Sequence, residues 1–421
     1  MEEKIKTSQK WPVAFRALRH YNYRLYFGGQ LISLTGTWMQ NVALSWLAYR
    51  LTGSSTILGL ISFLGLAPSL LFAAVAGVVA DRTNKHRLIV AMQSLAMLQA
   101  AALAVLALAK VITLWQIFLL AVFNGLIRAF DIPARQAFIV EMVDRSDLIN
   151  AISLNSSVFN GARIIGPTLA GMVVAAFGEG VCFALNAVSF LAVIAALLVM
   201  KLPEKTFRES REPFLKEMLD GFHYALNFLP VRNVLLLLGV IALFGTPYTV
   251  LLPVFVRQIF SGSAKELGFL MSAAGAGALV GAFYLGTHQN PLRLPRLIWL
   301  ATGFLGCGLM GLGFSRLFPL SLLLVAVIGF SAMLALAASN SLVQSIVEDD
   351  KRGRVMSLHT TVNTGLPTFG NLLAGVCADS LGAPVTVTAG GIVCLLTAIL
   401  FTITLPGFRR VIRPLLASPR G

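Results

Sequence analysis

The sequence has few charged residues, with Asp, Glu, Lys and Arg making up 12% of its 421 residues, against about 25% in an average soluble protein. Hydrophobic residues account for 57% of the chain. They are gathered in apolar runs of roughly 20 residues, which is the length that predicts a membrane-spanning helix. Only helices and closed β-barrels can hydrogen-bond all their backbone polar groups in lipid. Because these runs are continuously apolar rather than alternating, they favour helices.

Catalytic and cofactor-binding motifs are also missing. The sequence contains no Gly-x-x-x-x-Gly-Lys-Ser/Thr loop, which argues against direct drive by ATP. His, Cys, Asp and Glu form no cluster with metal-ligand spacing. We therefore expect no enzymatic activity, no metal and no cofactor. The four cysteines lie in apolar runs and are expected to be buried free thiols: Cys182, Cys307, Cys377 and Cys394.

Twelve apolar segments divide the chain into two sets of six. They lie at about 25–49, 56–80, 88–109, 114–140, 148–177, 181–200, 233–260, 266–287, 297–315, 317–345, 355–380 and 385–405. We expect an all-α membrane protein of twelve transmembrane helices in two six-helix pseudo-repeats. Its parts would be an N-terminal arm, a first half, a central loop with an amphipathic helix, a second half and a tail: 1–24, 25–200, 201–232, 233–405 and 406–421.

Basic residues indicate the orientation. With both termini in the cytoplasm, 26 of the 33 Lys and Arg residues fall in cytoplasmic segments and 5 in external loops. Cytoplasmic loops of membrane proteins carry such an excess, so both termini are expected to be cytoplasmic. The same rule explains the net charge of +15 without a nucleic-acid partner. Residues 1–24 are polar and basic and show no cleavable signal peptide.

The two halves share a glycine pattern. A shift of 209 residues places Gly36, Gly53, Gly59 and Gly77 on Gly245, Gly262, Gly268 and Gly286. A shift of 204 residues places Gly166, Gly171 and Gly178 on Gly370, Gly375 and Gly382. Repeated halves joined by a long central loop are typical of secondary transporters that hold their substrate near the membrane midplane.

A charged turn joins the second and third apolar segments. It contains Gly77, Asp81, Arg82, Lys85 and Arg87, with Asn84 and His86 between them. This turn resembles the signature loop of the major facilitator superfamily, Gly-x-x-x-Asp-Arg/Lys-x-Gly-Arg/Lys-Arg/Lys, in which Asn84 replaces the second glycine. The resemblance implies a cytoplasmic gate in which Asp81 helps to latch an outward-open state. The alternative is that the basic residues serve only to fix the loop inside.

Three further segments resemble the branch of this superfamily that contains enterobactin exporters and macrolide-efflux proteins. They are Asp131-Ile-Pro133-Ala-Arg135-Gln136-Ala, Gly161-Ala-Arg163-Ile-Ile-Gly166-Pro167 and Arg352-Gly353-Arg354-Val-Met-Ser. Gly161, Gly166, Pro167 and Gly171 also resemble the superfamily's antiporter motif, a pliable helix between the halves. Tight packing of helices through small residues is the plainer explanation for these glycines.

Charged residues within the apolar segments are candidates for function, because buried charge is costly in a membrane. Asp131 lies between Arg128 and Arg135 on one helix. It is either the acid that carries a coupling proton or an ionised member of the gate, paired with Lys85 or Arg135. Arg163 needs a cavity or a partner, either Asp131 or an anionic group of the substrate. Asp379, at the outer end of its segment, is interpreted as a helix cap.

Polar and aromatic residues in the first span suggest an amphipathic substrate cavity. The candidates are Gln30, Trp38, Met39, Gln40 and Asn41, with Tyr248 in the seventh span. Core packing is an equally good explanation for each of them.

These features predict a secondary transporter in a bacterial inner membrane. We expect a monomer that exports a small, moderately hydrophobic molecule, such as a drug or siderophore, in exchange for protons. A lysophospholipid flippase, an uncoupled uniporter and a non-transporting membrane scaffold or sensor are the alternatives.

Overall fold

The computed structural model describes residues 12–200, 227–288 and 290–417. The described residues are almost entirely helical, which confirms the all-α prediction. The amphipathic helix expected in the central loop lies mostly outside the described residues.

Six long helices form the N-terminal half: α1 (Tyr21–Thr52), α2 (Ser55–Arg82), α3 (Lys85–Leu108), α4 (Leu114–Met142), α5 (Leu148–Phe177) and α6 (Glu179–Leu198). The C-terminal half comprises α8 (Leu229–Val240), α9 (Tyr248–Val254), α10 (Ala264–Gly286), α11 (Leu294–Phe314), α12 (Phe318–Ile346), α13 (Asp349–Leu381) and α14 (Ala383–Ala417). Short 3-10 helices are η1 (Val13–Arg19), η2 (Arg145–Asp147) and η5 (Pro291–Arg293).

The segment 229–259 is one continuous span with two wider turns. Its π-helical segments are η3 (Ile241–Gly245) and η4 (Phe255–Ile259). The backbone N–H of Thr246 donates to Ile241 O at 2.9 Å, five residues back. Pro247 follows and has no N–H to continue the α-helical ladder. Such π-helical turns are frequent at functional sites, and η3 leads directly to Tyr248.

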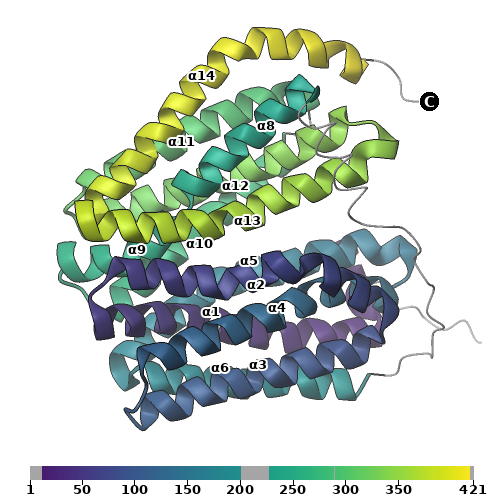
Figure 1. The fold of residues 1–421 in the computed structure, drawn as a ribbon. Helices are drawn as coiled ribbons and strands as arrows, with labels where there is room; N and C mark the ends of the chain where they lie inside the picture. The colour runs from purple at the N-terminus through teal and green to yellow at the C-terminus, as the bar shows by residue number, and fades with distance from the viewer. Residues whose placement is uncertain (1–11, 201–226, 289, 418–421) are drawn as a thin grey trace, which may run out of the picture.

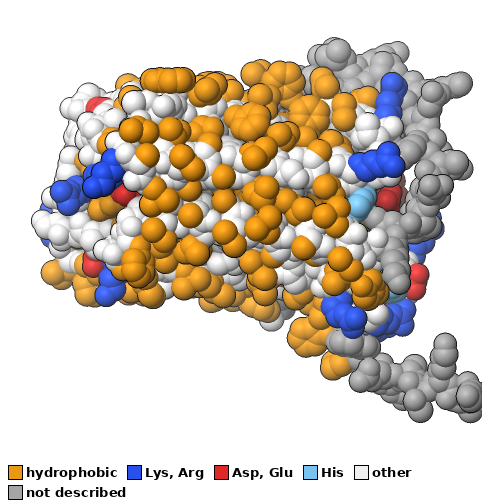
Figure 2. All heavy atoms as spheres, turned by 90° about the horizontal axis from the view of Figure 1, so that it is seen from below, with side chains coloured by type: hydrophobic (Ala, Val, Ile, Leu, Met, Phe, Trp, Pro, Cys, Tyr) orange, Lys and Arg blue, Asp and Glu red, His pale blue; other side chains and the backbone are white. Residues whose placement is uncertain are grey.

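Ten helical segments in the described part of the chain are long and apolar enough to cross a membrane. The segment 229–259 counts as one of them. Figure 2 shows the surface that such helices produce, with hydrophobic side chains over the middle of the visible face and Lys, Arg, Asp and Glu gathered toward its two ends.

The halves lie side by side, with the C-terminal helices above the N-terminal helices in Figure 1. The most extensive packing between them is made by two helix pairs, α2 with α13 and α5 with α10. In Figure 1 the ribbons of the two halves lie close together at the left-hand end and diverge toward the right-hand end, where the C-terminus lies.

Glycines allow close approach at both of these crossings. A Cβ atom on Gly268 would lie 2.3 Å from Pro167 O and 3.1 Å from the Cα of Gly171. At the other crossing, a Cβ atom on Gly375 would lie 2.5 Å from Ser55 O and 3.1 Å from the Cα of Gly59. These are the glycines that the 209- and 204-residue shifts match between the halves, so the two crossings are built in the same way.

Candidate functional site

A cavity of about 480 Å³ lies between the two halves. Helices α1 to α5 line one side, and the other side is formed by the residues that follow η3 and by α10, α12 and α13. Trp38, Asn41 and Tyr248, three of the residues predicted for a substrate cavity, line it. Gln99 and Asn124 also line it and were not predicted, although polar residues inside apolar runs are a signal that could have found them.

Gln30, Met39 and Gln40 were predicted to line the cavity, but they are buried inside the N-terminal half and are absent from its lining. Gln40 donates to Gln99 Oε1 at 3.0 Å and accepts from Asn186 Nδ2 at 2.8 Å. This chain of amides satisfies polar groups that would otherwise be costly to bury. Neighbouring side chains of a helix point in different directions. The polar residues of the first span could therefore be recognised in the sequence, but not which of them point into the cavity.

Arg128 and Arg163 are the charged residues in the described lining of the cavity. Arg128 lies on α4 and Arg163 on α5. Within the described residues, neither guanidinium has a carboxylate at ion-pair distance. Of the alternatives expected for Arg163, a cavity or a partner such as Asp131, the structure shows the cavity. The guanidinium of Arg163 lies 5.9 Å from the centre of the Trp38 ring, a cation–π contact.

Gly166 allows that contact to form. A Cβ atom at Gly166 would lie 2.6 Å from the Cβ of Trp38 and 2.9 Å from Thr35 O, so only glycine lets α5 approach α1 this closely. Pro167 follows it and removes one backbone donor from α5. By contrast, a Cβ atom on Gly161 would meet nothing within 4 Å. The glycines of α5 therefore serve different contacts, one with α1 and one, at Gly171, with α10.

Asp131 is buried beside the cavity and outside its lining. Its carboxylate accepts from Arg135 Nε at 2.8 Å and from Gln93 Nε2 at 2.9 Å. Arg135 also donates to Gln30 Oε1 at 2.9 Å. Of the two partners predicted for an ionised Asp131, the structure selects Arg135, because Lys85 pairs with Glu141 at 3.2 Å.

The predicted gate loop joins α2 to α3. Gly77, Asp81 and Arg82 lie in the last two turns of α2, and the side chain of Asp81 is outside the described part of the structure. Asn84 caps α3 by accepting from the N–H of Arg87 at 3.1 Å, with a φ of −66°. Arg82 and Arg87 are exposed.

The second-half cytoplasmic segment begins α13. Arg352 is paired with Asp349 one turn earlier, and its Nη2 also lies 3.5 Å from Val347 O. Arg354 lies half a turn further along the same helix.

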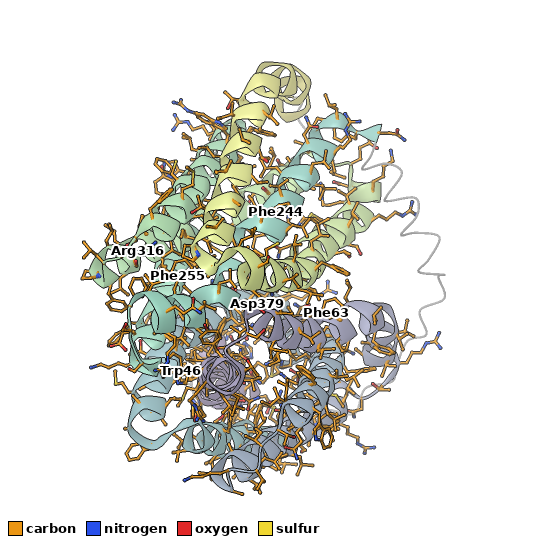
Figure 3. The ribbon with its side chains drawn as sticks, turned by 60° about the vertical axis from the view of Figure 1, so that its left-hand side comes forward. Trp46, Phe63, Phe244, Phe255, Arg316 and Asp379 are labelled. Atoms are coloured by element: carbon orange, nitrogen blue, oxygen red, sulfur yellow. The ribbon has the colours of Figure 1, made fainter. Side chains whose placement is uncertain are left out.

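Asp379 bridges the two halves at the end of the molecule remote from the gate loop. Its carboxylate accepts from Ser54 Oγ at 2.6 Å and from the backbone N–H groups of Ser55 and Thr56 at 2.6 and 3.0 Å. Figure 3 shows Asp379 where the two halves meet. The interpretation of Asp379 as a helix cap is confirmed, but the helix that it caps is α2, in the opposite half of the protein.

Asp147 organises the opposite end and was missed in the sequence. It accepts from Arg16 Nε at 2.7 Å and from His20 Nε2 at 2.9 Å, and it pairs with Arg19 Nη2 at 2.8 Å. These contacts fix η1 of the N-terminal arm to the start of α5. Its partners lie more than 120 residues away in the sequence, so no local pattern predicts them.

The expectation of buried thiols is partly wrong. Cys182 and Cys394 are buried, Cys377 is half-buried and Cys307 is exposed. An apolar run in a membrane helix has a face toward lipid as well as a face toward the core, and Cys307 lies on the outer face of α11. The described residues contain no group of three or more His, Cys, Asp or Glu side chains placed to hold a metal ion.

Residues 13–412 match a protein family described as transmembrane secretion effector. The chain belongs to this family of the major facilitator superfamily. It is therefore a membrane transport protein and not an enzyme.

Curated relatives extend over nearly the whole chain. It is 27% identical to the staphyloferrin A transporter of Staphylococcus aureus, over 90% of this chain and 95% of the relative. It is also 27% identical to the multidrug efflux pump Tap of Mycolicibacterium fortuitum, over 88% and 92%. Identity to the enterobactin exporter of Shigella boydii is 25%, over 96% of each chain.

Solved structures share the fold. A bacterial homologue of the human lysosomal transporter Spinster, in an inward-facing and unoccupied conformation, matches with a TM-score of 0.70 and 14% identity over 95% of this chain and 99% of that one. A POT family transporter in complex with 5-aminolevulinic acid matches with a TM-score of 0.73 and 12% identity, over 92% and 96%.

Proposed function

We propose that this protein is a secondary active exporter of a small, moderately hydrophobic molecule, working by alternating access in a bacterial inner membrane. The observation that carries this proposal is the cavity between the halves, which both halves line and which combines apolar walls with a few polar groups. Pockets of this size and composition are typical binding sites for small molecules. The export and efflux named for its relatives support the direction of transport.

The proposal includes twelve membrane-spanning helices, with both termini in the cytoplasm and the protein acting as a monomer. To the ten apolar spans it adds α1 and α13, which contain more polar residues and are 32 and 33 residues long. At 1.5 Å per residue, each is longer than the roughly 30 Å core of a bilayer. The excess of Lys and Arg in alternate loops supports the orientation.

In this orientation the contacts between the halves fall at the external end, where Asp379 caps α2 and Gly268 contacts Pro167. The structure then corresponds to an inward-open state, closed to the outside. Opening to the outside would separate α13 from α2 and remove the Asp379 carboxylate from the α2 N-terminus. Outward opening would bring the Asp81 loop into contact with the C-terminal half.

Proton exchange is the proposed energy source, with Asp131 as the residue to test. An acid that carries the coupling proton must release Arg135 when it is protonated, whereas an acid of the gate stays ionised. The pairing of Asp131 with Arg135 and Gln93, away from the cavity lining, supports the gate role.

The experiment uses purified protein in liposomes that contain a pH-sensitive dye, with a panel of amphipathic drugs, siderophores and lysolipids. Substrate-triggered proton movement supports antiport. If that movement is lost in Asp131→Asn while substrate binding persists, Asp131 carries the proton; if it continues, Asp131 belongs to the gate. Substrate movement without proton movement in the unmutated protein would replace antiport with a uniporter or flippase, and no movement of any compound would contradict export.

A further inference from the structure

The charges in the cavity come from one half of the protein and have one sign. Arg128 and Arg163 belong to the N-terminal half, and the described lining contains no Asp, Glu, Lys or His. Of the nearby charges, Asp131 is neutralised by Arg135, with which it forms an ion pair at 2.8 Å. The cavity therefore keeps two positive charges that the described part of the protein does not compensate.

Burying an unpaired charge is costly, and within a membrane protein such a charge marks a ligand or ion site by default. Arginine is suited to this role because its planar guanidinium donates two parallel hydrogen bonds to a carboxylate or phosphate. The two arginines also disfavour a cationic ligand by repulsion.

The side chain of Arg163 is held by its surroundings. Its guanidinium lies against the Trp38 ring, and Gly166 allows α1 and α5 to approach closely enough for this contact. The backbone one residue further on is also fixed, since Ser272 Oγ donates to Ile164 O at 2.6 Å. A side chain held in this way loses little conformational freedom when it binds a ligand.

The opposite wall has no charged side chain among the described lining residues. The C-terminal half contributes the apolar side chains of Val250, Leu252, Met271 and Ala332, together with hydroxyl groups near Tyr248. Methionine adapts its shape to irregular apolar ligands. Both sides of the cavity thus offer apolar surface, and in the described lining only the N-terminal side offers cationic donors.

We infer that the substrate is an amphipathic organic anion, whose acidic group binds Arg128 and Arg163 while its apolar body packs against the apolar walls that both halves contribute. This inference rests on the proposed function, because it specifies the class of molecule that the exporter carries. Both arginines lie on the N-terminal half, so the acidic group stays with that half while the C-terminal half rocks against it.

The test uses three fluorescent probes that share one apolar body. These are 6-(dansylamino)hexanoic acid, its primary amide and the corresponding trimethylammonium compound. Their binding to the detergent-solubilised full-length protein is measured by equilibrium dialysis, and their movement is followed in proteoliposomes. The variants are Arg128→Gln, Arg163→Gln and Arg163→Lys. Arg257→Gln is the matched control, since Arg257 is exposed on η4 and lies outside the cavity lining.

We expect the acid to bind at least about tenfold more tightly than the amide, which is the effect of one charge-assisted hydrogen bond. Arg128→Gln and Arg163→Gln should each remove most of this preference without weakening binding of the amide. Arg163→Lys should restore part of it, and Arg257→Gln should leave it unchanged.

Equal or tighter binding of the amide or the ammonium probe would overturn the inference, as would failure of the acid to bind or a preference that survives both glutamine variants. Export is tested separately by movement across the membrane. Binding of the acid without its movement across the membrane would contradict export but not the anion site. Movement of the amide as fast as the acid would contradict the anion site but not export.

Discussion

The N-termini of α2 and α10 occupy matching positions in the two halves, yet they receive their capping carboxylates from different sources. In α10, Ser263 and Glu266 form a capping box, with the N–H of Ser263 donating to Glu266 at 2.7 Å. The 209-residue shift places Ser54 on Ser263 and Ile57 on Glu266. Since α2 has no glutamate of its own there, Asp379 of the opposite half supplies the carboxylate.

The difference has a consequence for conformational change. The cap of α10 is local and persists however the halves are arranged. In α2, Ser54 Oγ accepts locally from the N–H of Ile57 at 3.3 Å, but the carboxylate contact from Asp379 exists only while α13 lies against α2. A carboxylate at a helix N-terminus is stabilising by roughly 0.3–1 kcal/mol when exposed and by up to about 2 kcal/mol when partly buried. Energies of this size are enough to bias two nearly balanced conformations.

The largest expected effect comes from adding a side chain at Gly268, where α10 packs closely against α5. Gly268→Val places methyl groups against Pro167 O, which a Cβ atom alone would approach to 2.3 Å. Overpacking of this kind costs about 1–3 kcal/mol, so the thermal unfolding temperature in detergent should fall. Gly28→Ala is the control, because a Cβ atom there meets nothing within 4 Å. Equal unfolding temperatures for the two variants would show that the crossing is not tightly packed.

Asp379→Asn breaks the cap that crosses the interface. The amide can still accept a hydrogen bond but lacks the charge that favours the α2 N-terminus, so closure should weaken by about 1 kcal/mol, or roughly fivefold in population. The readout is the rate at which a membrane-impermeant thiol reagent added outside labels Asn41→Cys, in a protein whose native cysteines are replaced. An unchanged rate would mean that Asp379 does not hold the external end shut.

Glu266→Gln weakens the corresponding cap within one half and is the counterpart of Asp379→Asn. The side-chain amide keeps an acceptor, so the loss of stability should be under about 1 kcal/mol. Labelling of Asn41→Cys from outside should stay at the rate of the parent protein, because this cap does not link the halves. Faster labelling, equal to that of Asp379→Asn, would remove the distinction between the two caps.

The difference between local contacts and contacts across the two halves also explains which features the sequence could predict. Apolar runs at 114–140 and 148–177 predict α4 (Leu114–Met142) and α5 (Leu148–Phe177) closely, because length and hydropathy are local properties. The Ser263-x-x-Glu266 spacing is equally local and could have been recognised as a capping box. Asp379 could be recognised as a cap, but the helix that it caps lies 323 to 325 residues away in the sequence.

The candidate site was less predictable for a similar reason. Arg163 and Trp38 were singled out separately, but their contact depends on how α5 packs against α1 at Gly166. The π-helical turn at Ile241–Gly245, which precedes Tyr248, follows from Pro247 only once the surrounding helix is known to continue. Hydrophobic patterning identifies spans, whereas the direction of each side chain depends on the packing of the two halves.

If the external end is closed by Asp379 and must open during alternating access, a reversible cross-link at that contact should stop transport. Ser54→Cys and Asp379→Cys are combined in a protein without its native cysteines and joined by a short bis-methanethiosulfonate, which forms a disulfide with each cysteine and releases methanesulfinate. Export of the compound that moves protons in the liposome assay is then followed before and after reduction. We predict that the cross-linked protein does not transport and that reduction restores transport, while each single variant is unaffected by the reagent. Transport by the cross-linked protein at the rate of its reduced form would show that α13 and α2 do not separate during transport.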